Sequence, residues 1–399
     1  MTPFFHITVD VSKEGKDVSE KVLKFFGAFV LFLKKIKRAV FKAIAKIYEF
    51  FCSHAKLKDR VFFYTIRSDG NLTENIKCVY DAYDGEKVYF AKMLPHSVKY
   101  VARAKWLLLT SKVVVTDDYL KYLRMVRLRK EQSVVQIWHA GGAFKKFGLD
   151  APSRLTAEEE KATHSQYTDV CVSSEYVRRF YAGAFGIDDE VVKATGTPRT
   201  DMLLDHEIQR SQKKSILSKH PFLSGKKVYL YLPTFREING TVVDFDSKID
   251  WVKLNDELSD DEVFIVSRHP VEKNGFFDGE YFSRVRDLTQ EPTEELLSVA
   301  NVVITDYSSI IFDAALLEIP LVFYCPDYDT YERSFYLDYE KDLPGRILKS
   351  SEDLLSSVRS ALKSGKDEAE TAFRQKEMGA CDGNSTARVI GIIKKRLSR

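Results

Sequence analysis

The chain has 399 residues, of which 44% are hydrophobic and 30% charged, which predicts two or three globular domains and excludes an extended disordered protein. The formal net charge is +3, but residues 61–399 hold 48 basic and 52 acidic side chains, so the body of the chain lacks the basic surface that nucleic-acid binding requires. Five widely spaced cysteines form no CxxC pair, which favours a reducing, cytoplasmic compartment over a disulfide scaffold.

The first 60 residues are strongly basic, with 13 Lys and Arg against 6 Asp and Glu. From Lys21 to Lys46 there is no acidic residue, and the apolar side chains fall in one arc of a helix opposite most of the lysines. The longest uncharged stretch, Phe25 to Leu33, has nine residues, whereas a membrane-spanning helix needs about 20. We therefore expect residues 1–60 to lie on an anionic membrane surface as a basic amphipathic segment. The alternative is a helix that packs through its apolar face within a domain.

After residue 60 the chain alternates short β-branched runs with helical stretches, which is the pattern of α/β domains with parallel sheets. Most of these runs are continuously apolar, as in strands that are covered on both faces. The predicted strands are 112–116, 134–138, 170–172, 228–232, 263–266, 301–305 and 321–324. A Lys- and Ser-rich stretch, 209–227, separates two series of strands. We therefore predict an α/β domain over 61–210, a second over 211–365, and C-terminal helices over 366–399.

Polar, cationic and glycine residues follow the predicted strands in both halves. Examples are Asp117 after 112–116, His139 after 134–138, Thr234 after 228–232, Arg268 after 263–266 and Asp306 after 301–305. In open α/β sheets ligands bind at the carboxyl ends of the strands. The site is therefore expected between the two domains.

His139 stands in the segment QIWHAGGAFKKFG, between an apolar strand and the glycine pair Gly141 and Gly142, with Lys145 beyond. A histidine suits proton transfer near neutral pH, and glycines allow a substrate to approach the backbone closely. The functional interpretation is a general base beside a glycine turn that admits a substrate. A core or capping histidine is the alternative.

Two segments of the second half have the residue types of a phosphate site. Arg268 and His269 follow a strand, and their fork and ring N–H groups suit phosphate oxygens, although an exposed loop can carry such a pair by chance. In the segment TDYSS, Asp306 ends a strand, and Ser308 or Ser309 begins a helix predicted over 310–318. A helix start with free N–H groups and hydroxyls binds anions; an ordinary serine cap is the alternative.

Two further segments supply candidate ligand contacts. They are Thr234 and Arg236 in PTFRE, and Pro198 and Arg199 in TGTPRTDML. Both segments can also simply shape the cleft. The sequence requires no cofactor, and Asp117-Asp118 leaves a divalent metal open. P-loop, GxGxxG, HExxH and GxSxG motifs are absent, which disfavours P-loop hydrolysis, nicotinamide chemistry and serine hydrolysis.

The order of these motifs resembles the CDP-glycerol glycerophosphotransferase family, whose members build teichoic acids and related capsular polymers in Gram-positive bacteria. The resemblance covers about residues 100–350 and includes the tail YDTYERSFYLDYEKDLPG, Tyr328 to Gly345. It implies two Rossmann-like domains facing across a cleft, a GT-B-like fold, and a peripheral enzyme on the cytoplasmic face of the membrane.

The resemblance also implies transfer of glycerol phosphate or ribitol phosphate from a CDP-activated donor to a hydroxyl of a prenyl-diphosphate-linked saccharide or polymer, with release of CMP. By matching motif, His139 is the base that activates the acceptor hydroxyl. By the same match, Arg268, His269, Ser308 and Ser309 are expected to bind the donor diphosphate, with Thr234 and Arg236 at the donor nucleotide or diphosphate. His269 is expected to stabilise or protonate the leaving phosphate, and Asp306 to orient the loop. The acceptor or the cleft is expected to involve Gly141, Gly142, Lys145, Pro198 and Arg199. A glycosyltransferase of the same architecture that uses a nucleotide sugar, and a non-catalytic membrane-bound scaffold, are the competing hypotheses.

Overall fold

The structure is a computed structural model that describes residues 32–37, 39–40, 42–93, 97–151, 155–238, 241–243, 245–269, 282–331, 334–365 and 367–399. The chain divides into two compact units, Met1–Lys56 and Leu57–Arg399. The predictions made for residues 1–31 fall outside the described part.

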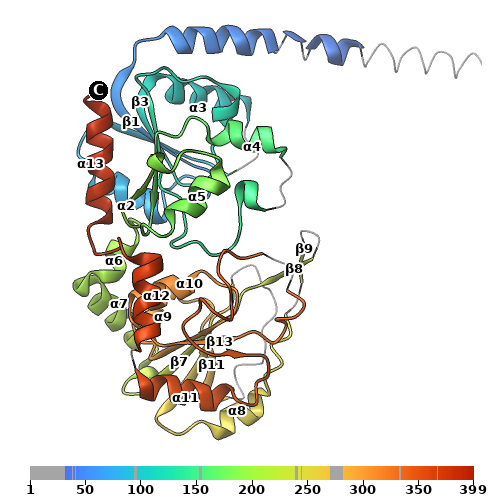
Figure 1. Ribbon diagram of the computed structural model, residues 1–399, viewed down its shortest axis with the longest axis vertical. Coiled ribbons are helices and arrows are strands. Elements are labelled where there is room, and N and C mark those ends of the chain that lie inside the picture. The colour runs from blue at the N-terminus through green and yellow to red at the C-terminus, as the bar shows by residue number, and fades with distance from the viewer. Residues whose placement is uncertain are drawn as a thin grey trace, which may run out of the picture. The chain divides into compact units, whose positions relative to one another are not determined.

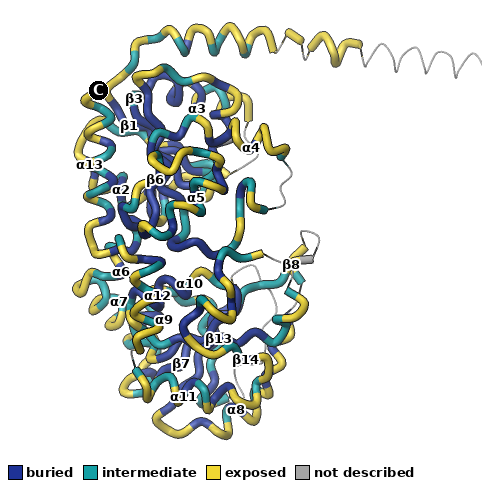
Figure 2. The backbone as a smooth tube through the Cα atoms, in the orientation of Figure 1, coloured by how far each residue is buried: buried dark blue, intermediate teal, exposed yellow. Residues whose placement is uncertain are grey.

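The first unit is helical over 32–37, 39–40 and 42–54. Most of its large apolar side chains are exposed, from 44% for Ile36 to 66% for Phe51, whereas Cys52 is buried; Figure 2 draws most of this helix in the colour of exposed residues. Within the described part of the chain, no helix is both long enough and apolar enough to cross a membrane.

The second unit contains two six-stranded sheets, and all strands within each sheet run parallel (Figure 1). The strand order of the first sheet is β2 (Lys87–Ala91), β1 (Lys58–Thr65), β3 (Ser111–Thr116), β4 (Ser133–Gln136), β5 (Asp169–Val172) and β6 (Val192–Ala194). The order of the second is β11 (Val285–Asp287), β10 (Glu262–Val266), β7 (Lys227–Leu232), β12 (Val302–Thr305), β13 (Leu321–Tyr324) and β14 (Ile347–Leu348). A separate antiparallel hairpin joins β8 (Arg236–Ile238) to β9 (Thr241–Val243).

All seven strands predicted from the sequence are present, with ends that differ by at most two residues. The largest difference is at β4, which ends at Gln136 because Trp138 has a left-handed backbone (φ +48°) that cannot continue a strand. The short edge strands β6, β11 and β14 have two or three residues each, too few for an apolar run to mark them.

Helices cover the first sheet. They include α2 (Glu74–Ala82), α3 (Val98–Thr110), α4 (Ala157–His164) and α5 (Arg178–Phe185), with 3-10 turns at Lys121–Met125, Gly148–Asp150 and Asp189–Val191. Helix α6 (Thr200–Leu204) instead packs on other helices, and its Leu204 contacts the core of the second sheet. Alternate residues of β1 and β3, among them Phe63 and Val113, pack with Ile76 of α2 in one buried cluster. The other face also buries residues such as Phe62 and Val114, which explains why these strands are apolar without alternation.

The second sheet is buried on both faces in the same way. One face packs on α7 (His206–Lys219), α9 (Thr293–Leu297), α10 (Ile310–Leu316) and α12 (Glu368–Met378). The other packs on α8 (Trp251–Glu257) and α11 (Leu354–Ser364), as Figures 1 and 2 show. Successive residues of β7 alternate between the two clusters, with Leu230 in the first and Tyr229 and Tyr231 in the second.

The stretch 209–227 lies between the two sheets in sequence, as predicted, but much of it is helix α7. The carboxylate of Asp205 accepts hydrogen bonds from the first-turn N–H groups of Glu207 and Ile208, and Ile216 anchors the helix in the core of the second sheet. Helix α10 begins at Ile310, as predicted, and ends at Leu316. The boundary at 210/211 stays a prediction.

The two C-terminal helices pack on different sheets. Phe373 of α12 belongs to the core of the second sheet. Helix α13 (Ser385–Leu397) inserts Val389 and Ile393 into the core of the first sheet. The chain therefore returns from the second sheet to the first at residues 379–384.

Candidate functional site

His139 lies just beyond the carboxyl end of β4, and its ring is held on one side. Its Nδ1 is 3.0 Å from the main-chain oxygen of Asp117, and because a carbonyl can only accept, Nδ1 carries the proton. Neutral His139 then has its lone pair on Nε2, which is the arrangement that a general base requires. The side chain is 26% exposed.

The charges around His139 oppose one another. Burial, and next the positive charge of Arg67, lower the pKa of His139, whereas the carboxylate of Asp118, 3.9 Å from Nδ1, acts to raise it. Arg67 lies 3.6 Å from Asp118. Burial also raises the pKa of Asp117 to about 7. At neutral pH the ring is therefore mostly unprotonated and able to accept a proton.

Trp138 supports the ring of His139. The two rings stack with centroids 4.3 Å apart, and the indole stacks on Phe147 at 5.2 Å. The left-handed backbone of Trp138 is stabilised by the buried Asn75, whose amide donates to the Trp138 carbonyl at 2.9 Å. The same amide accepts a hydrogen bond from the main-chain N–H of Arg199 at 2.9 Å.

The glycine pair predicted to admit substrate is packed against helices of the second half. A Cβ on Gly141 would lie 2.8 Å from Met378 Cε, and one on Gly142 would lie 2.3 Å from Phe312 Cζ. Gly142 also has φ +62°. The small size of these residues therefore serves the close approach of α10 and α12. That they also admit a substrate stays a prediction.

The segment after the glycines pairs with the aromatic tail motif. Phe144 accepts a hydrogen bond from the N–H of Tyr336 at 2.8 Å, the N–H of Lys146 donates to Ser334 at 3.0 Å, and Lys145 faces Phe335 in an antiparallel bridge. Two motifs far apart in the sequence are thus joined backbone to backbone.

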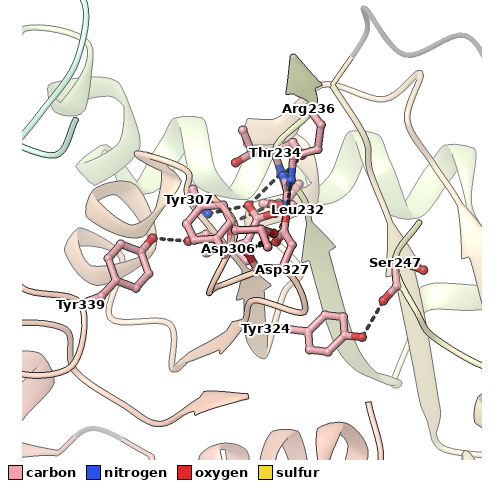
Figure 3. A network of polar contacts seen from close by, with 11 residues as sticks. Leu232, Thr234, Arg236, Ser247, Asp306, Tyr307, Tyr324, Asp327 and Tyr339 are labelled. Carbon is pink, nitrogen blue, oxygen red and sulfur yellow. Dashed lines mark hydrogen bonds and ion pairs between the residues drawn. The ribbon is translucent and has the colours of Figure 1, made fainter. Parts of the chain in front are cut away.

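Asp306 is the centre of a polar network at the carboxyl ends of β7 and β12 (Figure 3). One carboxylate oxygen accepts hydrogen bonds from the N–H groups of Thr234 (2.8 Å) and Tyr307 (2.6 Å), and the other pairs with Arg236 at 2.9 Å. Arg236 also binds both oxygens of Asp327, at 2.6 and 3.0 Å. Burial alone would lower the pKa of Arg236, but these two carboxylates outweigh it and raise the pKa. Asp306 thus joins the segments that contain PTFRE and TDYSS.

An aromatic stack adjoins this network. The rings of Tyr307 and Tyr331 are stacked at 3.6 Å, and Phe335 is nearly parallel to both. The guanidinium of Arg236 lies over Phe245 at 4.0 Å, and the ammonium of Lys145 lies 5.9 Å from the Tyr331 ring. The sequence motifs contain these rings, but no periodic pattern indicated that they would stack.

Arg268 and His269 follow β10 as predicted, with partners that the sequence did not indicate. The Nε and Nη2 groups of Arg268 donate to Asp287 at 3.3 and 3.0 Å, and its main-chain N–H donates to Thr289. The ring of His269 lies 4.8 Å from Phe235, and burial lowers its pKa. A phosphate at this point would share Arg268 with a carboxylate.

The two serines at the start of α10 differ. Ser308 accepts a hydrogen bond from the N–H of Ile310 at 3.3 Å. Ser309 is the residue before the helix and is exposed, but its side chain makes no capping hydrogen bond. Ser308 therefore supplies the cap, and the hydroxyl of Ser309 does not take part in it.

Arg199 and Pro198 are placed by packing between the two halves. Arg199 forms a two-pronged ion pair with Asp313 of α10, and Pro198 is buried. A Cβ on the neighbouring Gly196 would lie 2.4 Å from the Ala380 carbonyl. The segment TGTPR therefore packs on the C-terminal return of the chain.

Metal ligands do not cluster near Asp117-Asp118: no group of three or more His, Cys, Asp or Glu side chains in the described part of the chain could hold a metal ion. The sequence did not indicate several polar partners of these segments. Three are described above: Asn75, Asp287 and Asp313. The other two are Ser173 and Glu377, which accept hydrogen bonds from the N–H groups of Gly142 and Ala143.

Comparison with known proteins places this geometry in a family. The sequence model of the family CDP-Glycerol:Poly(glycerophosphate) glycerophosphotransferase matches residues 31–395 of this chain. A teichoic acid poly(ribitol-phosphate) polymerase of Bacillus spizizenii is 39% identical over 274 residues, which cover 63% of this chain and 41% of the relative. The teichoic acid ribitol-phosphate polymerase TarK of Staphylococcus aureus is 32% identical over 88% of this chain and 71% of its own. The chain thus spans about two fifths of the first relative.

Among solved structures, the wall teichoic acid polymerase TagF superposes with a TM-score of 0.73 at 21% identity, over 92% of this chain and 98% of that one. This likeness confirms the predicted GT-B-like α/β fold. The family match extends beyond the stretch 100–350 in which the resemblance was found. The chain belongs to the CDP-glycerol:poly(glycerophosphate) glycerophosphotransferase family.

Proposed function

We propose that this protein transfers a polyol phosphate from a CDP-activated donor to a hydroxyl group of a prenyl-diphosphate-linked saccharide or polymer, with release of CMP. The acceptor oxygen attacks the phosphorus that carries the polyol, and the bond from that phosphorus to the bridging oxygen of CMP breaks. The acceptor proton passes to Nε2 of His139. Ribitol phosphate is the first polyol to test, because both sequence relatives described above carry ribitol-phosphate in their names.

The observation that carries this proposal is the state of His139. Its Nδ1–H is committed to the Asp117 carbonyl, and its lowered pKa leaves Nε2 without a proton at neutral pH. A neutral alcohol is a poor nucleophile, so an unprotonated imidazole supplies the base that the transfer requires.

We place the donor at the carboxyl end of the second sheet. Arg268, His269, Ser308 and Ser309 are proposed to contact the diphosphate, and His269 to stabilise or protonate the leaving CMP phosphate. Asp306 supports this by holding the loops that carry Thr234 and Arg236. Because Arg236 is already paired with two carboxylates, we expect it to position the donor loop and to meet the nucleotide by an edge of its guanidinium.

The acceptor is proposed to approach from the side of the loop that follows His139, near Gly141, Gly142 and Lys145, with Pro198 and Arg199 shaping the cleft. We further propose that the protein works at the cytoplasmic membrane surface as a peripheral protein. The exposed apolar side chains of the helical residues 32–37, 39–40 and 42–54, together with their lysines, support this. No nucleic-acid partner is proposed.

The test is CMP release from CDP-ribitol, CDP-glycerol and a set of nucleotide sugars, each with a prenyl-diphosphate-linked disaccharide and with His139→Ala as the control. Release from one CDP-polyol, lost in the variant, is the expected result. Release of UDP or GDP from a nucleotide sugar would instead establish a glycosyltransferase. Absence of release from every donor, together with normal polymer in cells that carry His139→Ala, would establish a scaffold.

A further inference from the structure

Groups from three other elements hold the loop that follows His139 in place. One is the hydroxyl of Tyr181 on α5, which donates to the Gly142 carbonyl at 3.2 Å. The N–H of Gly142 donates to Ser173 Oγ at 2.9 Å, and the N–H of Ala143 donates to Glu377 Oε2 at 3.4 Å. Ser173 follows β5, and its hydroxyl in turn donates to the main-chain oxygen of Glu377 at 2.6 Å. Glu377 lies in the last turn of α12. Glu377, a residue of the second half, therefore binds the loop directly through its carboxyl group and indirectly through Ser173.

This loop has few side-chain anchors of its own. Phe312 and Met378 fill the space where Cβ atoms of Gly142 and Gly141 would lie, so the glycine backbone depends on hydrogen bonds from outside. Helix α12 is a firm support, because Phe373 of α12 stacks on Phe312 of α10 with ring planes 5° apart. Loop, α10 and α12 thus form one packed arrangement.

Glu377 occupies an unfavourable environment for a carboxyl group. It is completely buried, and its Oε1 has no hydrogen-bond partner among the described residues. Burial raises its pKa to about 7. The neighbouring Lys376 pairs with Asp342, and the guanidinium of Arg179 lies over aromatic rings. A buried carboxyl group with a hydrogen bond to only one of its oxygens destabilises the fold. Such a group indicates a site where the placement of functional groups matters more than stability.

We propose that Glu377, together with Ser173, is a positioning residue that fixes the backbone of Gly142 and Ala143 and thereby the placement of His139. The inference rests on the proposed role of His139 as the base. It also means that the base, which belongs to the first sheet, is correctly placed only when α12 of the second half is docked against its loop.

The experiment compares Glu377→Ala with Glu377→Gln and with a control on the same helix. Glu370 lies two turns earlier on α12, is half-buried, and accepts the N–H of Leu321 at 3.1 Å, a contact within the second half. We expect Glu377→Ala to lower kcat by roughly tenfold or more and to leave the KM for the donor unchanged. Glu377→Gln, which keeps an oxygen for Ala143, should recover most of kcat, and Glu370→Ala should keep it.

The protonation of His139 gives a second readout. Burial lowers its pKa, so a loosened loop should let the pKa return upward toward the usual value of about 6.5. Titration of the His139 ring by NMR measures this without any substrate. We expect an upward shift in Glu377→Ala and no shift in Glu370→Ala, with both proteins folded by circular dichroism.

A folded Glu377→Ala protein with the kcat and the His139 titration of the unmodified protein would overturn the proposal. An equal loss of kcat in Glu370→Ala would also overturn it, because helix stability alone would then explain the effect. If the unmodified protein releases CMP from no donor, the proposed function fails while the NMR titration still decides the positioning role.

Discussion

Arg199 and Asp313 are 114 positions apart and form a two-pronged ion pair, with Nη1–Oδ2 and Nη2–Oδ1 distances of 2.9 and 2.8 Å. Arg199 belongs to the segment that follows β6 and Asp313 to α10, so the pair joins the two sheets. Both side chains are largely buried. Burial alone would lower the pKa of Arg199, but Asp313 outweighs it and raises the pKa. Removal of either side chain would therefore leave the charge of the other buried without a partner, which is strongly destabilising.

Removal of one partner should destabilise the protein strongly. Arg199→Ala leaves the Asp313 carboxylate buried without a cation, and we expect a loss of about 3 kcal/mol in the free energy of unfolding. Arg199→Lys should lower the free energy of unfolding by less, because the ammonium keeps a positive charge beside Asp313. Some stability should still be lost, because an ammonium cannot bind both carboxylate oxygens in one plane. Urea unfolding followed by circular dichroism measures both. The exposed pair of Arg210 with Glu207 is the control, since Arg210→Ala should change stability by less than about 0.5 kcal/mol; equal effects of the two alanine variants would contradict this account.

The pH dependence of the reaction should respond in opposite directions to the two charges beside His139. A base is active when unprotonated, so activity should rise with pH through the pKa of His139, which lies below its usual value. Arg67→Gln removes a positive charge that lowers this pKa, and should move the acidic limb of the kcat/KM profile to higher pH. Asp118→Asn removes a negative charge that raises it, and should move the limb to lower pH. His139→Ala should lose a factor of about 10² or more.

Two shifts of the acidic limb in the same direction, or no shift in either variant, would exclude His139 as the group that titrates. Because Arg67 and Asp118 lie 3.6 Å apart, the double variant should fall between the two single ones.

Much of the fold follows from local patterns. Helices cover both faces of each sheet, and each of the seven predicted strands is therefore a nearly continuous apolar run that can be recognised in the sequence. The ends of parallel strands meet at one edge, so the positions of His139 and Asp306 at strand ends were predictable as well. The partners of these residues were not. Ser173, Glu377 and Asp313 meet the site only through the return of the chain along α12 and the docking of α10.

The same reason explains the incomplete assignments for Arg268 and Arg199. A planar guanidinium suits a phosphate and a carboxylate equally. Asp287, which binds Arg268, stands in a stretch with no motif character, and Asp313 lies on the helix that follows TDYSS, where no spacing indicates that it would pair with Arg199. Sequence spacing identifies the cation but does not identify its partner.

Glu377 should make stability fall as the pH rises. Its pKa of about 7 in the folded protein lies above the ordinary value of 4.5, so between these two values the folded chain holds a proton that the unfolded chain releases. The cost of burying the charge grows with pH over this window and is complete above pH 7. Glu377→Gln has no charge to bury, so its Tm relative to the unmodified protein should increase from pH 4.5 to 7 and then level off.

Calorimetry of both proteins at pH 5, 6, 7 and 8 measures this difference. Asp117, whose pKa is also raised to about 7, contributes the same slope to both proteins and cancels. A Tm difference that stays constant with pH would show that Glu377 does not titrate in this window.

Asn75 should be essential for the turn that carries His139. Its amide binds the Trp138 carbonyl and the Arg199 N–H, both at 2.9 Å. Asn75→Ala leaves these two backbone groups without partners, and we expect a loss of about 2 kcal/mol together with lower kcat. Thermal unfolding and CMP release are the measurements. Asn71→Ala is the control, because Asn71 is exposed and its contact with Ser68 uses the main chain. A comparable loss in Asn71→Ala would show that the effect does not depend on the two hydrogen bonds of the Asn75 amide.

Apolar residues of the N-terminal helix should control membrane attachment. Ile36 and Ile44 are 44% and 59% exposed and lie on the same side of the helix as Val40. Full burial of one isoleucine is worth about 1.5 to 3 kcal/mol, so replacing both with serine should weaken sedimentation with vesicles that contain anionic lipid by a factor of about 10² or more. Val252→Ser, at a 62% exposed valine of α8, is the control, since it changes an exposed apolar residue elsewhere. Binding should also weaken as salt rises, because the lysines contribute through surface potential. Equal sedimentation of all three proteins would show that the helix uses its apolar side for something other than a membrane.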